Sequence, residues 1–377
     1  MKNFYKLLLP IAATFFVSSY PAYALFGMGE DKKEKENTAK KVDTVKERTD
    51  LLESEKNTIS IFEQNVRSVV NVSNIRIART GWWFHSIQTE QPAGAGSGFV
   101  WDDKGHIVTN YHVIANADSF VISFHKDKET YDAEVVGTYP QKDIAVLKLK
   151  KRPNKLFPIT AGDSKTLKVG QKALSIGNPF GLDHTMTSGI ISATDRKIRG
   201  VANVTIHGMI QTDCSINPGN SGGPLYDSAG NVIGMNTMIY SASGSSSGVG
   251  FSVPINTIKN IVPQIIKYGK VKRPGLGIGL LEERLKYHFG IEKGIVVKYV
   301  DPKSPAAKAG IEGMSRNQRG RYELGDIVLK IDGKDVNNYD EIFNVLDNYN
   351  VGDEVKIEYL RGDDIKTTKL RLMELSE

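Results

Sequence analysis

Short apolar segments alternate with turn residues from about residue 69 to residue 253, and this pattern constrains the fold most strongly. The segment GSGFVWDDKGHIVTNYHVI carries two apolar runs around Asp103-Lys104-Gly105, an arrangement typical of a β-hairpin. The same spacing returns in DAEVVGTYPQKDIAVLKL, QKALSIGNPFG, SGIISATDR and NVIGMNTMIY. Many short strands separated by Gly, Asn, Asp and Pro predict antiparallel sheets that close into barrels or pack as a sandwich.

Size and charge exclude several classes of protein. A chain of 377 residues has room for two or three domains, and its 40% hydrophobic and 24% charged content matches an ordinary globular protein. The net charge of +6 is not gathered in a basic run, so we expect no nucleic-acid partner. Because Cys214 is the only cysteine, no disulfide can form within the chain, and packing must stabilise the fold.

The first 24 residues have the features of a secretory signal peptide. Lys2 and Lys6 are followed by the apolar run Leu7–Val17 and by the cleavage-type sequence Ala22-Tyr23-Ala24. An apolar run of about 11 residues is too short for a stable transmembrane helix, so we expect export and no stable membrane span. The alternative is an uncleaved N-terminal anchor.

Composition and periodicity divide the rest of the chain. Residues 25–57 are rich in charges of both signs and predict a solvated tether or an exposed helix. From Ile59 the apolar residues recur at helical spacing, so the folded part is expected to begin near residue 58. A later helical stretch ends at Gly269, in the usual place for a glycine after a helix, and a second unit follows. We therefore expect one domain at 58–270 and another at 271–377.

The segment Asn217–Leu225, with the sequence NPGNSGGPL, is the strongest candidate for chemistry. A serine hydroxyl needs an adjacent base and a site for an oxyanion, and glycines beside Ser221 allow backbone amides to converge. The amides of Gly219 and Ser221 are the expected donors, with Asn220 between them. The alternatives are a glycine-rich surface turn and the G-x-S-x-G elbow of an α/β-hydrolase. The elbow fails, because the turn leads into a strand and because only His288 follows the serine.

The base and its orienting acid must therefore precede the serine. His112 lies in TNYHVI at the end of a predicted strand, and Asp143 lies in QKDIAVL just before another. A carboxylate there can be partly buried and can hold an imidazole in one tautomer. Each residue alone is compatible with a structural role. The order His112, Asp143, Ser221, each beside a strand, is the chain order of chymotrypsin-type proteases.

Three motifs, T-N-Y-H-V, D-I-A-V-L-K-L and G-N-S-G-G-P-L, resemble the signatures of the HtrA/Deg family of serine proteases. The segment ALSIGNPFGLDHTMTSGIIS at 173–192 is also similar, and the resemblance runs from about residue 58 to residue 373. It implies a mainly β chain, with a chymotrypsin-like double β-barrel protease domain followed by a smaller α+β PDZ domain. It also implies that His112 is the general base, Asp143 its orienting acid and Ser221 the nucleophile, with an oxyanion hole at Gly219, Asn220 and Ser221.

The same resemblance implies an activity, partners and a compartment. The expected function is a serine endopeptidase that cleaves unfolded or damaged proteins and peptides in an exported compartment, the bacterial periplasm. We expect a homotrimer or a higher oligomer, and no metal or other cofactor, since neither H-E-x-x-H nor a cluster of His and Cys ligands occurs. The alternative function is a chaperone or adaptor that binds unfolded chains through PDZ and barrel surfaces, with proteolysis secondary.

Specificity follows from residues expected near the substrate pocket. Ser215 stands where trypsin-like relatives carry an acidic residue, six positions before the nucleophile, which argues against cleavage after Lys or Arg. By resemblance, Met238, Ile239 and Tyr240 approach the pocket wall and imply small or medium aliphatic side chains before the scissile bond. Cys214 is expected to be a small buried residue rather than a reactive thiol.

In the second domain, Gly275-Leu276-Gly277-Ile278 resembles the carboxylate-binding loop of PDZ domains, whose backbone amides receive the C-terminal carboxylate of a peptide. We expect this loop to bind hydrophobic C-terminal peptides. The insertion at 312–323 is similar to that of chloroplast-lumen members. The run Trp82-Trp83-Phe84 predicts either a contact surface or local packing of its own loop.

Overall fold

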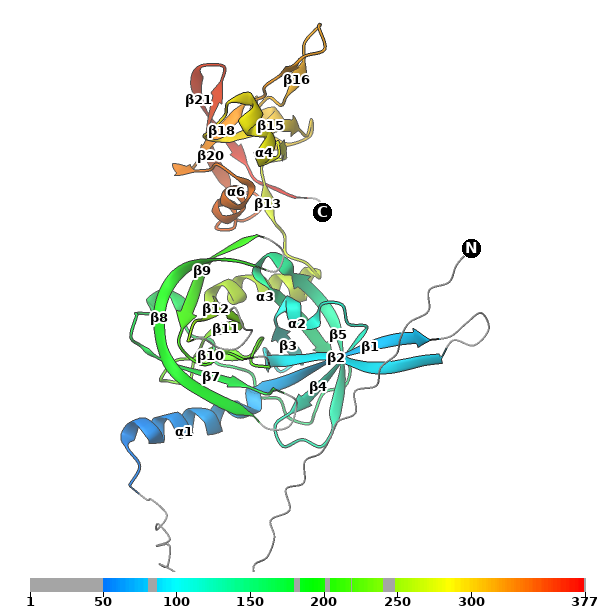
Figure 1. The fold of residues 1–377 in the computed structure, drawn as a ribbon, viewed down its shortest axis with the longest axis vertical. Coiled ribbons are helices and arrows are strands. Elements are labelled where there is room, and N and C mark those ends of the chain that lie inside the picture. Colours follow the sequence, from blue (N-terminus) through cyan, green and yellow to red (C-terminus); the bar gives the residue numbers. More distant parts are fainter. Residues whose placement is uncertain are drawn as a thin grey trace, which may run out of the picture. The chain divides into compact units, whose positions relative to one another are not determined.

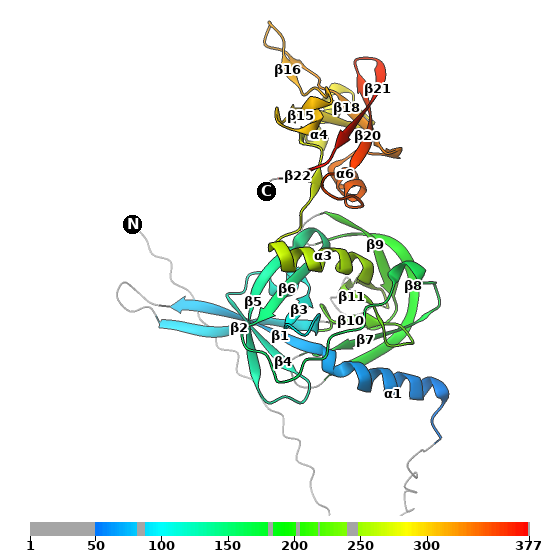
Figure 2. The same ribbon diagram turned by 180° about the vertical axis from the view of Figure 1, so that it is seen from behind.

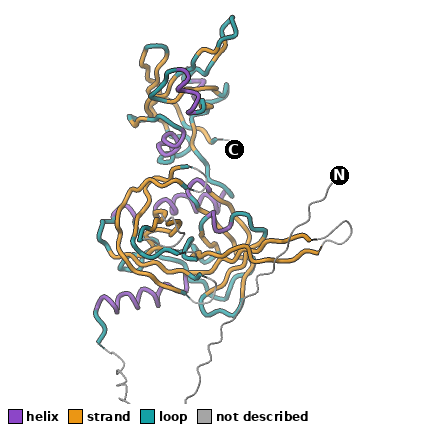
Figure 3. The backbone as a smooth tube through the Cα atoms, viewed as in Figure 1, coloured by secondary structure: helices purple, strands orange, loops and turns teal. Residues whose placement is uncertain are grey.

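The structure of the protein is a computed structural model that describes residues 50–80, 87–179, 184–200, 204–217, 219–239 and 248–375. The expected signal peptide at 1–24, most of the expected tether at 25–57 and the run Trp82-Trp83-Phe84 lie outside these residues. The described residues from Leu51 onward are assigned to one unit. Strands predominate in it, as the orange segments of Figure 3 show, which confirms the mainly β fold expected from the alternating pattern.

Six antiparallel strands close the first barrel in the order β1-β2-β3-β6-β5-β4. The strands β1 to β5 are labelled in Figure 1. They are β1 (Val69–Thr80), β2 (Ile87–Val100), β3 (His106–Thr109), β4 (Ser119–Phe124), β5 (Thr130–Tyr139) and β6 (Ile144–Leu149). Ile144 and Val146 of β6 pack into a core shared by both barrels, whereas Ala145 and Leu147 fill the first barrel. Both faces of β6 are therefore buried, which explains why the sequence there is continuously apolar.

A second closed barrel has the strand order β10-β11-β12-β9-β8-β7. Its strands are β7 (Lys172–Gly177), β8 (Thr185–Arg199), β9 (Thr205–Thr212), β10 (Pro224–Tyr226), β11 (Val232–Ile239) and β12 (Gly250–Pro254). The predicted helix follows directly as α3 (Ile255–Tyr268), which buries Ile258, Val262 and Ile265 in the shared core. It ends where Gly269 adopts a φ of 73° and its amide bonds to the carbonyl of Ile265, as expected for a glycine in that position.

The first helix differs from the expected one. It runs as α1 (Glu53–Asn65), so it begins inside residues 25–57, the segment expected to be a tether or an exposed helix, and it lies along the outside of the barrels in both Figure 1 and Figure 2. Ile61 is buried on it, whereas Ile59 is 43% exposed. The expected apolar face continues past the helix, because the chain tightens into the 3-10 turn η1 (Val66–Ser68) and then enters β1. Val66 and Val69 are buried from those positions rather than from α1.

The C-terminal domain is an α+β unit with its own hydrophobic core, which includes Val297, Val328 and Ile357. Its main sheet has the order β14-β15-β18-β20-β21, with β19 paired to β18. The strands are β13 (Pro274–Gly275), β14 (Ile278–Leu280), β15 (Ile295–Val300), β16 (Ser315–Arg316), β17 (Tyr322–Glu323), β18 (Ile327–Ile331), β19 (Lys334–Asp335), β20 (Glu354–Arg361), β21 (Asp364–Arg371) and β22 (Met373–Glu374). The helices are α4 (Glu283–Lys286), α5 (Pro305–Lys308) and α6 (Tyr339–Leu346).

Candidate active site

His112 is held in place by a short helical turn at the barrel interface. The turn α2 (Tyr111–Ile114) follows β3, and its last two residues, Val113 and Ile114, are buried and anchor it. The imidazole itself stays partly accessible, with 32% of the side chain exposed. A base in this position can therefore be reached by substrate while its backbone is fixed by packing.

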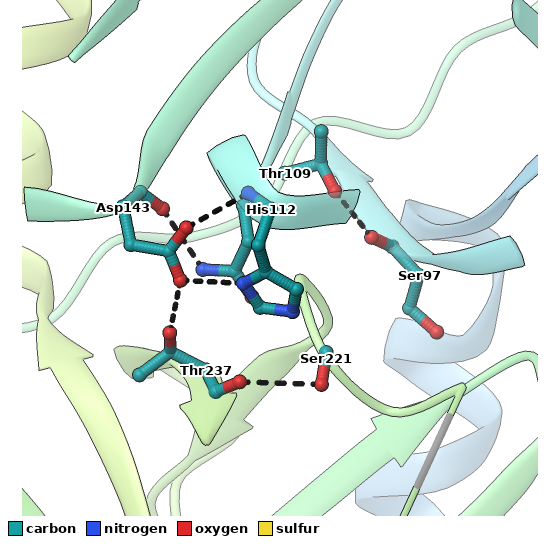
Figure 4. A network of polar contacts seen from close by, with 7 residues as sticks. Ser97, Thr109, His112, Asp143, Ser221 and Thr237 are labelled. Carbon is teal, nitrogen blue, oxygen red and sulfur yellow. Dashed lines mark hydrogen bonds and ion pairs between the residues drawn. The ribbon is translucent and has the colours of Figure 1, made fainter. Parts of the chain in front are cut away.

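Asp143 is fully buried and contacts His112 twice (Figure 4). It follows the 3-10 turn η2 (Pro140–Lys142) with a φ of 56°, a left-handed conformation that aspartate tolerates. Its Oδ1 accepts a hydrogen bond from the His112 backbone amide at 2.9 Å, and its Oδ2 lies 2.7 Å from Nδ1 of the imidazole. A proton on Nδ1 satisfies the carboxylate, so neutral His112 keeps Nε2 as its acceptor.

The backbone of Asp143 is also tied to the histidine segment. Its carbonyl oxygen accepts hydrogen bonds from the Tyr111 amide at 3.2 Å and from Nδ2 of Asn110 at 3.0 Å. The acid and the turn that carries His112 are therefore joined through four hydrogen bonds. Such redundancy keeps a catalytic imidazole in one orientation.

Ser221 projects from a tight turn between β9 and β10 that only glycine can form at two positions. Gly219 and Gly222 have φ values of 105° and 84°. A Cβ on Gly219 would lie 2.3 Å from the Cβ of Pro179, and one on Gly222 would lie 2.1 Å from the carbonyl oxygen of Ser97. Gly219 and Gly222 are thus explained by positive φ and by close contacts with Pro179 and Ser97.

Thr237, on β11, contacts both the acid and the serine, and reasoning from the sequence did not identify it (Figure 4). Its hydroxyl donates a hydrogen bond to Oδ2 of Asp143, and its carbonyl oxygen accepts one from the Ser221 hydroxyl at 3.3 Å. The side chain is buried, with 2% of Thr237 exposed. The available signal was the polar pair Asn236-Thr237 within the otherwise apolar run VIGMNTMI.

The three residues expected at the oxyanion hole lie in one turn. The Asn220 amide donates to the carbonyl of Asn217 at 3.0 Å, and its Nδ2 donates to the carbonyl of Ser215 at 3.3 Å. Asn220 therefore closes the turn, and the amides of Gly219 and Ser221 remain the candidate donors to an oxyanion.

The expected pocket residues are only partly described. Ser215 is exposed, and its carbonyl also accepts a hydrogen bond from the Thr187 hydroxyl at 3.1 Å. Met238 and Ile239 belong to β11, but their side chains and all of Tyr240 lie outside the described residues. Cys214 is buried, and this burial raises the pKa of its thiol to about 11.

The expected carboxylate-binding loop lies in the C-terminal domain. Gly275 pairs with Met373 in a two-residue ladder, and the Leu276 side chain is buried. Gly277 has a φ of 77°, and Ile278 begins β14, where it pairs with Val300. β14 is the terminal strand of the described sheet, the position to which a peptide adds as a further strand in β-augmentation.

In the described part of the chain, no three His, Cys, Asp or Glu side chains are grouped so that they could hold a metal ion. Nor do the described helices include one that is long and apolar enough to cross a membrane.

Comparison with known proteins identifies the family to which the chain belongs. Residues 96–235 match a trypsin-like peptidase domain and residues 274–372 match a PDZ domain. Protease Do-like 1, chloroplastic, of Arabidopsis thaliana is 48% identical over 307 residues, which cover 81% of this chain and 69% of that protein. A probable periplasmic serine endoprotease, DegP-like, of Halomonas elongata is 38% identical over 280 residues, or 73% of this chain and 56% of that protein.

A solved structure agrees with the sequence relatives. The HtrA-type protease AlgW with a decapeptide superimposes with a TM-score of 0.65 and 30% identity, covering 85% of this chain and 99% of that one. The double barrel, the trypsin-like peptidase match, the PDZ match and these relatives agree with the motifs noted in the sequence. The chain therefore belongs to the HtrA/Deg family and is a serine protease with a chymotrypsin-like double barrel and one PDZ domain.

Proposed function

We propose that His112, Asp143 and Ser221 form the catalytic triad of this protease. The observation that carries the proposal is the arrangement of two carboxylate contacts from Asp143 to His112, with Ser221 on the other side of the imidazole (Figure 4). The Ser221 oxygen attacks the scissile carbonyl carbon while its proton passes to Nε2 of His112. The amides of Gly219 and Ser221 stabilise the oxyanion of the tetrahedral intermediate.

The second half of the reaction reverses these roles. His112 gives the proton to the departing amine, which leaves an acyl-enzyme on Ser221. A water molecule, deprotonated by His112, then attacks the acyl carbon and releases the new carboxyl end of the substrate. Before the first step the Ser221 hydroxyl must rotate, because it now donates to the Thr237 carbonyl rather than along the line to the imidazole. Catalytic hydrogen bonds often tighten only when substrate is bound.

The substrates proposed are unfolded or damaged proteins, and the proposed compartment is the bacterial periplasm. A signal peptide at 1–24 supports export, and named relatives are described as periplasmic or chloroplastic. In this proposal residues 25–57 tether a protease domain at 58–270, and the PDZ domain at 271–377 captures hydrophobic C-terminal peptides. The proposed pocket, with Ser215 near its base, favours small or medium aliphatic side chains.

Casein degradation tests the activity directly. The wild type should degrade casein and should lose this activity with a serine-directed covalent inhibitor, whereas Ser221→Ala should be inactive and unlabelled. The alternative function is that of a chaperone that binds unfolded proteins. If Ser221→Ala protects unfolded proteins from aggregation as well as the wild type does, this chaperone function operates beside proteolysis. Casein cleavage by Ser221→Ala at more than roughly a tenth of the wild-type rate would reject the proposed triad.

The proposed assembly is a homotrimer formed through the N-terminal part of the protease domain. A cavity of about 1130 Å³ beside α1 is lined by Phe62 and Phe124 together with charged side chains such as Glu63 and Lys126, so it offers a mixed apolar and charged surface to a second copy. Light scattering on the chain without residues 272–377 should still report a trimer. A folded monomer would place the contact on the PDZ domain instead.

A further inference from the structure

We propose that Ser97 is a positioning residue that sets the oxyanion hole, an inference that rests on the proposed role of Ser221. Ser97 lies on β2, close to its end, and is fully buried. Although it belongs to the first barrel, both its hydroxyl and its amide make hydrogen bonds with segments of the second barrel that surround the nucleophile.

The hydroxyl joins the two segments that border the oxyanion turn. It donates to the Gly219 carbonyl at 2.6 Å and accepts from the Asn178 amide at 2.8 Å. Asn178 is followed by Pro179, whose ring leaves no room for a side chain on Gly219. The Ser97 hydroxyl therefore fixes Gly219 directly, through the hydrogen bond to its carbonyl. The same hydroxyl also bonds the amide of Asn178, which positions the neighbouring Pro179 against Gly219.

The backbone of Ser97 fixes the serine and the histidine segment as well. Its amide donates to the Ser221 carbonyl at 2.8 Å, and its carbonyl accepts from the Thr109 hydroxyl at 2.7 Å (Figure 4). Thr109 ends β3, immediately before the residues that carry His112. Ser97→Ala keeps the amide and the carbonyl that make these two backbone contacts, so this substitution removes only the hydroxyl's contribution.

Loss of the hydroxyl leaves two buried polar groups, the Gly219 carbonyl and the Asn178 amide, without this partner. Buried groups in that state are costly, so the turn is expected to shift until they find others. The Gly219 carbonyl shares one rigid peptide plane with the Asn220 amide, and this plane lies between the peptide groups that carry the Gly219 and Ser221 amides. A shift of this carbonyl is therefore expected to change the direction of both candidate donors. The effect should therefore fall on transition-state stabilisation, which depends on amide direction, rather than on ground-state binding of substrate.

The test is steady-state kinetics of Ser97→Ala on a chromogenic peptide, together with inhibition by a peptidyl aldehyde. We expect kcat to fall roughly 10- to 100-fold, less than the 10²–10³-fold loss for outright removal of an oxyanion-hole donor, with KM within about threefold. Affinity for the aldehyde, whose adduct with Ser221 places an oxygen in the hole, should fall by a similar factor. Affinity for the matching peptide alcohol should stay unchanged. Ser97→Thr, which keeps the hydroxyl, should recover most of kcat.

Thr212→Val provides a matched control. The Thr212 hydroxyl is also buried and has the same kinds of partner as the Ser97 hydroxyl. It donates to the Ile190 carbonyl at 2.8 Å and accepts from the Cys214 amide at 3.1 Å. We expect it to lower the melting temperature while leaving kcat within about twofold. Equal losses of kcat in Thr212→Val and Ser97→Ala would show a general effect of lost stability and would overturn the inference.

Two other outcomes would also overturn the inference that Ser97 sets the oxyanion hole. The first is a kcat for Ser97→Ala within threefold of the wild-type value. The second is a folded Ser97→Thr whose kcat is as low as that of Ser97→Ala. If Ser97→Ala does not fold, Ser97→Cys allows the same comparison, because its thiol is a weaker donor in the same place. Failure of the triad is recognised separately, since Ser221→Ala would then remain active whatever the substitution at Ser97 does.

Discussion

Asp143 holds His112 through both carboxylate oxygens, one on the backbone amide and the other on Nδ1 of the ring. The two contacts fix the position of the residue and the orientation of its imidazole together. A single contact to Nδ1 would leave the ring free to tilt about that bond. The pair therefore specifies both the tautomer and the direction in which Nε2 can act.

Replacing Asp143 with Asn should lower kcat severely, by roughly 10⁴-fold on the scale seen for a triad, with the fold retained. The side-chain NH₂ of the new asparagine donates a hydrogen bond to Nδ1 of His112 and cannot accept one from it. The imidazole therefore adopts the tautomer with the proton on Nε2, and Nε2 can no longer act as a base. Casein cleavage and the kcat of a chromogenic peptide measure the effect. Circular dichroism checks the fold.

The chain contains a matched control in Asp102 and His106. Asp102 accepts from the His106 amide at 3.1 Å, and its Oδ2 lies 2.6 Å from Nδ1 of that ring, so the contacts repeat those of the proposed triad away from Ser221. Asp102→Asn should therefore keep kcat within about twofold. A similar loss of kcat in both variants would mean that Asp143 acts through stability alone.

Thr237→Val should lower kcat about tenfold, because Oδ2 of Asp143 would lose one of its two hydrogen-bond donors in a buried position. Thr237→Ser keeps the hydroxyl and should retain nearly full activity. The comparison is made at equal concentrations of folded enzyme, determined by active-site titration. Equal kcat values for the two variants would show that the hydroxyl does not support the acid.

The sequence predicted antiparallel sheets that close into barrels or pack as a sandwich, because short apolar runs such as that of β6 alternate with turn residues. The choice of a double barrel came from the resemblance of the motifs to a known family. It also identified His112, Asp143 and Ser221 as candidates, because each follows or precedes a predicted strand in a recognisable motif. Thr237 and Ser97 could not be found in this way. Their contacts join segments 94 and 122 residues apart, and nothing local marks a buried hydroxyl as part of a site.

The boundary of α1 shows a second limit of sequence reasoning. The apolar spacing of Ile59, Phe62, Val66 and Val69 is helical, yet the helix ends at Asn65. Hydrogen bonding in β1 begins at Val69 and extends the chain from there, so the tertiary pairing overrides the local period. Periodicity could locate the buried residues but not the element that buries them.

Ser215→Asp should raise the rate of cleavage after Lys and Arg relative to cleavage after Val and Ala. In the wild type we expect the aliphatic preference, since no carboxylate is expected at the base of the pocket. A peptide library with varied P1 residue, read by mass spectrometry, measures both. If the wild type already prefers basic P1 residues, the proposed pocket is wrong.

Cys214 should resist alkylation in the native protein. Burial raises the pKa of its thiol to about 11, so at pH 8 almost no reactive thiolate is present, and the side chain is also inaccessible. Iodoacetamide should modify the thiol in urea but leave native enzyme unlabelled and active. Rapid labelling at pH 8 with loss of activity would contradict this environment.

Peptides that end in a free hydrophobic carboxylate should bind the PDZ domain more tightly than their C-terminal amides, with micromolar Kd, about −8 kcal/mol. As the terminal strand of its sheet, β14 is expected to pair with the peptide as an added strand, and the amides near Gly277 are expected to receive the carboxylate. Isothermal titration calorimetry with both peptide forms tests this. Equal affinity for the two forms would reject carboxylate capture.

Two glycines in this segment separate the role of the loop from that of the strand. A side chain on Gly277 would require a φ of 77° and would place its Cβ 2.3 Å from the Cβ of Ser304, so Gly277→Ala must distort the loop. Gly279→Ala meets its nearest atom, the Cβ of Tyr299, at 3.4 Å, an ordinary contact. We therefore expect Gly277→Ala to lose peptide affinity at least tenfold, which corresponds to about 1.4 kcal/mol of binding free energy. Gly279→Ala should retain the wild-type affinity. The same peptide can be titrated into the wild type while the cleavage rate of a short chromogenic substrate is measured. If the peptide raises this rate and Gly277→Ala loses the response, the loop controls catalysis. A peptide that binds but leaves the rate unchanged shows that the PDZ domain only tethers substrate.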